Sequence, residues 1–567
     1  MSGAPRRRGW PLSRAAAPLA ASAVLLAAAP RAPAAQQSAA TGVRTADLPR
    51  TRAERTGYAE TTRYAEVLDF LARIAPLSER LHVTTFGYTN EGRALPLVVF
   101  GDVADAGPAA VRATGRLRVL VMADIHAGEV CGKEAALVLL RDLATGGHAE
   151  WADSLVLLVA PIYNADGNER IDLRNRRLQN GPVGGMGQRP NARGLDLNRD
   201  HTKLESPEAR SLVRLLRAYD PHVVIDLHTT NGTVHAYHLT YSPPLNPDTP
   251  AEIDALLRED WLPNVVRAIR ETEGWELHDY GNVPSTFQRE GAEGRERGWY
   301  TYDPRPRFST NYVGLRNRFG ILSEAYAYAP FEERIRASLR FVEELTGWAG
   351  RNAGKIRAAT RAADARSVVG EPLTLRAAPA RSEAPATILL GEVEDLRNPY
   401  TGERMLGRLD VRRPERMPEF VAFEPVESAR APAAYLVPQK LGGVLALLEA
   451  HGVRTLPLAA PLTARAEVFR IDSTRVAERE FQGHLQRELW GGYEVRDETF
   501  PPGTVLVPVD QPLGRLAFTL LEPRAPDGVV NWNLLDDALG GESPAAAYPI
   551  ARLPALPAGV CASCGRR

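Results

Sequence analysis

Three residues with metal-binding side chains occur at spacings that suit one zinc ion. His126 and Glu129 lie three residues apart in the segment His-Ala-Gly-Glu, and His228 ends the segment Asp-Leu-His. A histidine and a glutamate at this spacing aim a nitrogen and an oxygen at one point when they sit at a strand-to-helix turn. Zinc held by two histidines and one glutamate keeps its fourth position open for water. The three residues therefore predict a catalytic zinc site.

A stretch rich in arginine and asparagine is suited to bind a carboxylate. Residues 189–199 read Arg-Pro-Asn-Ala-Arg-Gly-Leu-Asp-Leu-Asn-Arg. A guanidinium presents a planar fork of N–H donors that matches a carboxylate, and Asn198 adds a neutral donor beside Arg199. Near a zinc ion, this composition suits a substrate that has a free carboxylate and develops negative charge on a carbonyl oxygen.

The apolar pattern predicts the elements that position these residues. Runs at residues 81–83, 95–100, 117–122, 155–160, 223–227 and 320–322 are typical of strands, and helices are expected at 134–143, 207–219 and 331–348. This alternation predicts an α/β fold with a mixed, mainly parallel sheet flanked by helices. The chemistry of such sheets lies beyond the carboxyl ends of the strands. His126, Asn164, His228 and Glu324 each follow a predicted strand, so we expect them at one sheet edge.

Five motifs together resemble the zinc carboxypeptidase family, the carboxypeptidase A-like metallopeptidases. They are HAGE at 126–129, PIYNADG at 161–167, RPNARGLDLNR at 189–199, DLH at 226–228 and LSEAYAY at 322–328. The resemblance covers about residues 58–350. It implies a carboxypeptidase-like α/β fold that binds one zinc ion.

The resemblance also implies a role for each matching residue. The zinc ligands fall on His126, Glu129 and His228, and the general base falls on Glu324. Asp196 matches the aspartate that holds the first zinc histidine through its other ring nitrogen, a role typical of a carboxylate behind a metal-bound imidazole.

Further roles concern the substrate. Asn198 and Arg199 match the pair that grips the terminal carboxylate, and Arg189 matches the arginine that stabilises the oxyanion, with Arg174 and Arg177 as alternatives. The family has a mobile tyrosine over the substrate, for which Tyr302 and Tyr312 both remain candidates, with Tyr302 favoured by its spacing from Glu324.

The chain departs from the family pattern directly after Arg199. Many members have asparagine and an aromatic residue there, whereas this chain has Asp200 and His201. The departure leaves the side-chain preference of the enzyme open. Arg305 and Arg307 are expected at the protein surface, although an acidic substrate would be an alternative explanation for them.

The predicted function is hydrolysis of the C-terminal peptide bond of peptides by a zinc-activated water. One alternative is a related zinc amidohydrolase that acts on peptidoglycan stem peptides or N-acyl amino acids. An alternative of another class is a non-catalytic binding module on a peptidase scaffold. Such modules usually lose a ligand or the base, and this chain keeps all four residues.

The length of 567 residues predicts several segments. Residues 1–34 have an arginine-rich start, an apolar stretch at 15–29 and an Ala-Pro-Ala cleavage site, which are typical of a secretory signal peptide. The apolar stretch is short for a membrane anchor, the alternative interpretation. A flexible segment (35–57), the catalytic domain (58–350), a helix or linker (351–366), a strand-rich α/β C-terminal domain (367–558) and a tail (559–567) follow. The protein is therefore expected to be secreted or periplasmic.

Composition narrows the remaining possibilities. Lys plus Arg and Asp plus Glu both total 69, so nothing in the net charge favours a nucleic-acid partner. No later segment is apolar enough to predict a membrane span. Three cysteines in an exported chain of this size do not predict a disulfide-built fold. Cys131 is expected to be buried, while Cys561 and Cys564 form a terminal pair that is expected to be a disulfide or a frayed tail rather than a metal site.

Overall fold

A mixed eight-stranded sheet forms the centre of the computed structural model, which describes residues 48–284, 295–540 and 547–557. The strands run in the order β1 (Leu81–Tyr88), β2 (Ala94–Phe100), β4 (Leu155–Ala160), β3 (Leu117–Ala123), β5 (Val223–Thr229), β9 (Phe319–Ala325), β6 (Leu239–Ser242) and β7 (Leu277–Asp279). The four central strands β4, β3, β5 and β9 are parallel to one another. The strands β1 and β2 pair antiparallel to their neighbours, while β6 pairs antiparallel with β9 and parallel with β7. This arrangement confirms the predicted α/β fold class.

The central strands are buried along their whole length. Every residue of β3, β4, β5 and β9 is buried, and their sequences are almost continuous apolar runs. Such runs are typical of parallel strands covered on both faces. The strands β6 and β7 were not predicted, because they are too short to give a clear pattern.

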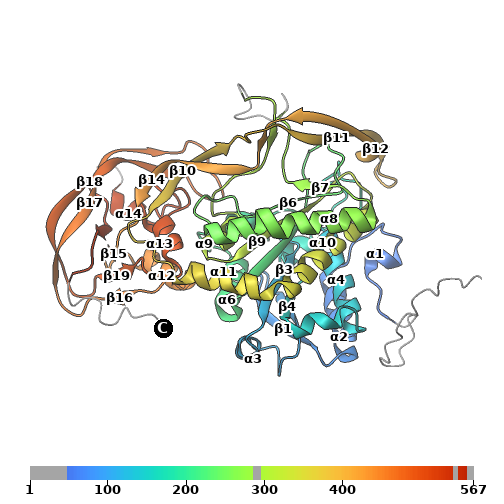
Figure 1. Cartoon of the computed structure of the whole chain (residues 1–567), viewed down its shortest axis with the longest axis horizontal. Coiled ribbons are helices and arrows are strands. Elements are labelled where there is room, and N and C mark those ends of the chain that lie inside the picture. Colours follow the sequence, from blue (N-terminus) through green and yellow to red (C-terminus); the bar gives the residue numbers. More distant parts are fainter. Residues whose placement is uncertain (1–47, 285–294, 541–546, 558–567) are drawn as a thin grey trace, which may run out of the picture. The chain divides into compact units, whose positions relative to one another are not determined.

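Helices cover both faces of this sheet (Figure 1). Leu227 of β5 lies against Gly132 of α4 (Cys131–Ala144), where an added Cβ would come within 2.5 Å of the Leu227 Cβ. The preceding residue, Asp226, accepts a hydrogen bond from Ser309 of α9 (Ser309–Leu315). Successive strand residues point to opposite faces, so α4 and α9 lie on opposite sides of β5.

The remaining helices of this part extend the two layers. The helix α10 (Phe331–Arg351) packs beside α4 and α8 (Leu262–Glu273), while α6 (Pro207–Tyr219) packs against β1. The others are α1 (Arg52–Arg55), α2 (Tyr64–Ile74), α3 (Pro108–Ala113), α5 (Ala165–Glu169), α7 (Ala251–Ala255) and α11 (Ala353–Ala365). Cys131 is buried at the start of α4, as predicted.

The C-terminal part is rich in strands, as expected. Its main sheet has the order β16 (Leu456–Pro457), β19 (Val505–Pro508), β15 (Ala434–Val437), β20 (Ala551–Leu553), β17 (Leu462–Val476) and β18 (Arg487–Phe500), and its pairs are antiparallel. It also contains the helices α12 (Gly442–His451), α13 (Gly514–Leu521) and α14 (Asp536–Leu539).

Two long antiparallel pairs extend from this part. They are β10 (Pro372–Ala380) with β14 (Ala422–Arg430), and β11 (Ala386–Arg397) with β12 (Arg404–Met417), and a short β13 (Glu419–Phe420) pairs with β8 (Trp299–Tyr300). The described residues belong to one compact unit. The boundaries proposed from the sequence therefore remain predictions.

Some sequence predictions fall outside the described residues. These are the signal peptide at 1–34 and the tail at 559–567, which contains the cysteine pair Cys561 and Cys564. Within the described ranges, no helix combines the length and apolar character needed to cross a membrane.

Candidate metal centre

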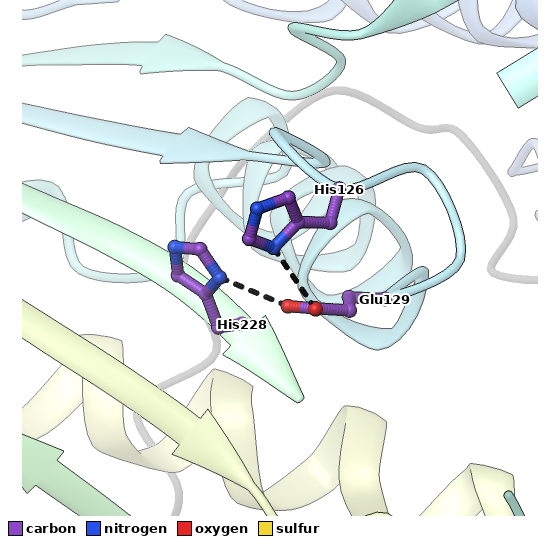
Figure 2. Close-up of side chains that lie close together, drawn as sticks. All are labelled: His126, Glu129 and His228. Atoms are coloured by element: carbon purple, nitrogen blue, oxygen red, sulfur yellow. Dashed lines mark hydrogen bonds and ion pairs between the residues drawn. The ribbon is translucent and has the colours of Figure 1, made fainter. Parts of the chain in front are cut away.

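His126, Glu129 and His228 meet at the carboxyl edge of the central sheet. Figure 2 shows the Glu129 carboxylate facing both imidazole rings. Its Oε1 lies 2.9 Å from His126 Nδ1, and its Oε2 lies 2.9 Å from His228 Nδ1. One ligand atom from each of the three side chains lies within 4.8 Å of the others. The sequence prediction that these residues converge agrees with this geometry.

Local structure explains how the three side chains reach one point. His126 and Glu129 occupy the turn between β3 and α4, which is closed by a 2.8 Å hydrogen bond from the Glu129 amide to the His126 carbonyl. His228 lies near the end of β5, the strand beside β3. The Thr229 amide donates a 3.0 Å hydrogen bond to Glu129 Oε2, which fixes the carboxylate against β5.

Each histidine has a second carboxylate behind it. Asp196 Oδ1 lies 3.0 Å from His126 Nε2, and Asp226 Oδ2 lies 2.9 Å from His228 Nε2. A carboxylate in this place orients a metal-bound imidazole and raises its basicity. Both rings therefore turn Nδ1 toward the common centre, and a nitrogen–oxygen–nitrogen donor set with this outer support fits zinc.

Glu324 stands beside this centre on the next strand. It is paired in register with His228 across the parallel strands β5 and β9. Its Oε2 is buried and has no hydrogen-bond partner among the described residues. Burial raises the pKa of Glu324 to about 8, although His228, Arg176 and Arg189 act to lower it. A metal cation held nearby would favour the carboxylate further.

One cavity of about 180 Å³ collects most of the residues predicted for the site. Its walls include His126, Glu129, Arg189, Asn198, Arg199, His228, Tyr302 and Glu324. Asp196 lies behind His126, and Tyr312 does not belong to the cavity wall. Segments far apart in the chain thus supply metal donors, a carboxylate and cationic groups to one small space.

Asn198 and Arg199 follow Asp196 in a short 3-10 helix (Leu197–Arg199). Asn198 Oδ1 accepts a 2.8 Å hydrogen bond from the Ser309 amide, and its Nδ2 has no partner among the described residues. The Arg199 guanidinium lies 3.9 Å from the ring centre of Phe308, which also lines the cavity. Both side chains are therefore held in place with N–H donors that remain available to a ligand.

Two arginines approach the Glu129 carboxylate. Arg189 lies 3.5 Å from Glu129 Oε1 and donates a 2.9 Å hydrogen bond to Asp196 Oδ2. Arg176, which was not predicted, contacts Glu129 Oε1 and donates a 2.7 Å hydrogen bond to Asn231. The alternatives Arg174 and Arg177 are exposed and do not line the cavity.

The two candidate tyrosines have different surroundings. Tyr302 lines the cavity, and its hydroxyl lies 2.7 Å from the Thr310 hydroxyl. Tyr312 is fully buried, and its hydroxyl lies 2.7 Å from His451 Nδ1. Tyr302 is therefore placed to meet a ligand in the cavity, whereas Tyr312, a residue of α9, turns toward His451 at the end of α12.

Other expectations near the site need correction. The expectation that Arg307 lies at the surface is wrong, because its side chain is buried and pairs with the buried Asp527. Arg305 is partly exposed and pairs with Asp303, so neither arginine extends freely toward a substrate. His201 is also buried, and burial lowers its pKa.

The structure adds residues that the sequence analysis did not assign. Asp226 lies in the predicted Asp-Leu-His motif, and strand alternation already places it on the same face as His228. Tyr280, Phe308 and Ser309 line the cavity but carry no recognisable motif. Only the folded chain shows that they belong to the site.

Comparisons with known proteins find similarity to zinc carboxypeptidases. Residues 67–305 match a family model described as zinc carboxypeptidase. "Carboxypeptidase 2" of Trichophyton rubrum is 24% identical over 526 residues, which cover 88% of this chain and 87% of that protein. "Carboxypeptidase 2" of Trichophyton equinum is 24% identical over 528 residues, with coverage of 88% and 87%.

Solved structures similar to this chain include two carboxypeptidases. A metallo-carboxypeptidase from Burkholderia cenocepacia aligns with a TM-score of 0.36 and 16% identity, over 50% of this chain and 68% of its own. Carboxypeptidase A from Helicoverpa armigera aligns with a TM-score of 0.37 and 16% identity, over 54% of this chain and 75% of its own.

Proposed function

We propose that this chain removes the C-terminal residue of peptides by zinc-dependent hydrolysis, since residues 67–305 match a family model described as zinc carboxypeptidase. The observation that supports this most strongly is the convergence of a His-Glu-His donor set, a buried carboxylate and carboxylate-binding groups on one cavity. Each of these features meets a separate requirement of the reaction.

One zinc ion per chain is held by His126, Glu129 and His228 in this proposal. When bound there, zinc supplies Lewis-acid chemistry, which polarises a carbonyl group and lowers the pKa of a water molecule. Asp196 and Asp226 keep the two imidazoles oriented, because Asp196 accepts a hydrogen bond from His126 Nε2 and Asp226 Oδ2 forms a 2.9 Å ion-pair contact with His228 Nε2.

Glu324 acts as the general base. Its buried Oε2 takes a proton from the attacking water and later delivers it to the nitrogen of the leaving amine. Arg189 stabilises the negative charge that develops on the carbonyl oxygen, since its guanidinium lines the cavity beside Glu129.

Asn198 and Arg199 bind the free carboxylate of the substrate. The free Nδ2 of Asn198 and the fork of Arg199 together present several donors, and ring stacking on Phe308 holds the fork in one orientation. Tyr302 is the tyrosine that meets the substrate, because it lines the cavity and Tyr312 does not.

A comparison of two substrates tests this function. A peptide with a free C-terminus is expected to lose its last residue, measured by mass spectrometry, and the same peptide with an amidated C-terminus is expected to stay intact. Cleavage of both peptides at equal rates would favour the amidohydrolase alternative. Zinc binding without turnover of a broad peptide panel would favour a binding module.

Export and domain organisation are part of the proposal. The arginine-rich start and apolar stretch within residues 1–34 support a cleaved signal peptide and a secreted or periplasmic location. We also propose a catalytic domain over residues 58–350 and a second domain over 367–558. N-terminal sequencing of the exported protein is expected to begin near Ala35; retention of residues 1–34 would contradict cleavage.

A further inference from the structure

A second cavity, of about 360 Å³, lies away from the metal centre and is lined by four arginines. Arg217 comes from α6, Arg316 and Arg318 follow α9, and Arg454 follows α12. The one acidic residue among the described lining residues is Asp220. The cavity therefore has a strong excess of positive charge.

Asp220 is already neutralised by other groups. It pairs with Arg318 at 2.7 Å and with Arg118, which lies outside the cavity wall, at 2.9 Å. Arg318 additionally pairs with Asp364 at 3.0 Å. These two arginines and two aspartates balance one another, so they leave the charges of Arg217, Arg316 and Arg454 uncompensated.

The three remaining arginines have no acidic partner among the described residues. Arg217 Nη1 donates to the Glu449 and Ala450 carbonyls, Arg316 Nη1 donates to the His451 carbonyl, and Arg454 Nη2 donates to the Asp510 carbonyl. Each guanidinium thus uses one nitrogen to hold a neighbouring segment. Other N–H groups remain, and Arg454 Nε is buried without a hydrogen-bond partner among the described residues.

His451 adds no compensating negative charge and no further positive one. Burial, together with Arg316 and Arg217, lowers its pKa to about 3. Its Nε2 donates a 3.0 Å hydrogen bond to the Thr202 carbonyl, and its Nδ1 accepts one from Tyr312. The imidazole is therefore neutral, and the excess charge comes from the three arginines.

Part of the remaining wall is apolar, although Gln511 also belongs to it. Leu216, Val224, Val313 and Leu513 are among its residues. Guanidinium forks match the oxygen atoms of phosphate bidentately, and a buried donor without a partner costs free energy until a ligand satisfies it. A dianion offsets three uncompensated charges better than a monoanion, and the apolar wall suits a carbon body attached to it.

We propose that this cavity binds a small organic phosphate monoester through Arg217, Arg316 and Arg454. The site is separate from the metal cavity, although one helix contributes to both. Ser309 and Thr310 of α9 line the metal cavity, while Val313 of the same helix lines this one.

Calorimetric titration of the zinc-loaded full chain with phenyl phosphate at low ionic strength tests the proposal. We expect one equivalent to bind. Arg454→Gln and Arg217→Gln are each expected to weaken binding about tenfold or more, because each removes charge-assisted hydrogen bonds. Arg361→Gln, which makes the same charge change on an exposed residue outside the cavity, is expected to bind as tightly as the unaltered chain.

Two further arms locate the ligand. Phenol, which lacks the phosphate, is expected not to bind, and Arg189→Gln in the metal cavity is expected to leave the phosphate affinity unchanged. The proposal is overturned by absence of saturable binding, by equal affinity in folded Arg454→Gln and Arg217→Gln, or by loss of binding in Arg189→Gln. Thermal unfolding checks that each variant is folded. If Arg454→Gln does not fold, Arg217→Gln, on the exposed side of α6, provides the test instead.

Discussion

Glu324 lies directly beside His228 on the neighbouring parallel strand. The two residues are paired in register across β5 and β9. Because side chains opposite each other on adjacent strands share a face, the sheet itself places the proposed base next to a metal ligand. The spacing between base and metal ligand is thus set by backbone hydrogen bonds of the most buried strands.

The first prediction concerns this base. Glu324→Gln keeps the shape of the side chain but removes its ability to take a proton, so we expect turnover to fall by about 10²–10⁴. Zinc content, measured by atomic absorption, is expected to stay at one per chain. Substantial turnover by a zinc-loaded, folded Glu324→Gln protein would exclude Glu324 from the role.

The second prediction concerns the carboxylate behind His228. Asp226→Asn weakens the support of the imidazole, so zinc affinity is expected to fall about 10–100-fold in competition with a chromophoric chelator. Asp254→Asn, on the surface helix α7, provides the matched control and is expected to retain full affinity. Equal affinity in both variants would show that Asp226 does not support the metal site.

The third prediction concerns carboxylate recognition. Arg199→Lys loses the planar fork and its stacking on Phe308, so KM for a free-carboxylate peptide is expected to rise about tenfold or more. Arg193→Lys, on the exposed part of the same loop, is expected to leave KM unchanged. A normal KM in Arg199→Lys would place the carboxylate elsewhere.

The fourth prediction concerns stability and pH. Glu205 Oε1 lies 2.6 Å from His484 Nε2, and His484 Nδ1 lies 3.0 Å from Asn533 Oδ1. Burial raises the pKa of Glu205, but hydrogen bonds from His484 and Lys203 outweigh it and lower that pKa to about 2. The hydrogen bond to Glu205 raises the pKa of His484 above its ordinary value of 6.5, against the opposing effect of burial.

These shifts define the pH window of the interaction. The Glu205 contribution is complete above its ordinary pKa of 4.5 and is lost as pH falls toward 2, while the His484 contribution is complete below 6.5 and is lost as pH rises through its raised pKa. Glu205→Gln is therefore expected to lower the free energy of unfolding, measured with urea, most strongly between about pH 4.5 and pH 6.5. Exposed Glu79→Gln is the control, and a pH-independent difference would refute the linkage.

Much of the site was predictable because strand ends in a parallel sheet meet at one edge. The apolar runs before His126, His228 and Glu324 identify buried strands, and the rule for carboxyl ends then brings the three residues together. The role of Asp226 follows from strand alternation as well, once the direction of His228 is known.

Residues whose place depends on distant contacts could not be predicted. Arg307 is buried because it meets Asp527, which lies 220 residues further along the chain. Tyr312 turns toward His451, 139 residues away, and only this contact separates it from Tyr302 as a candidate for the cavity. Local sequence patterns contain no information about such partners.

Anomalous diffraction at the zinc edge from crystals of the zinc-loaded protein tests the central claim most directly. The account predicts one peak per chain, about 2.0–2.2 Å from Nδ1 of His126, Nδ1 of His228 and a carboxylate oxygen of Glu129. No peak at this place, or a zinc ion held by other residues, would contradict it.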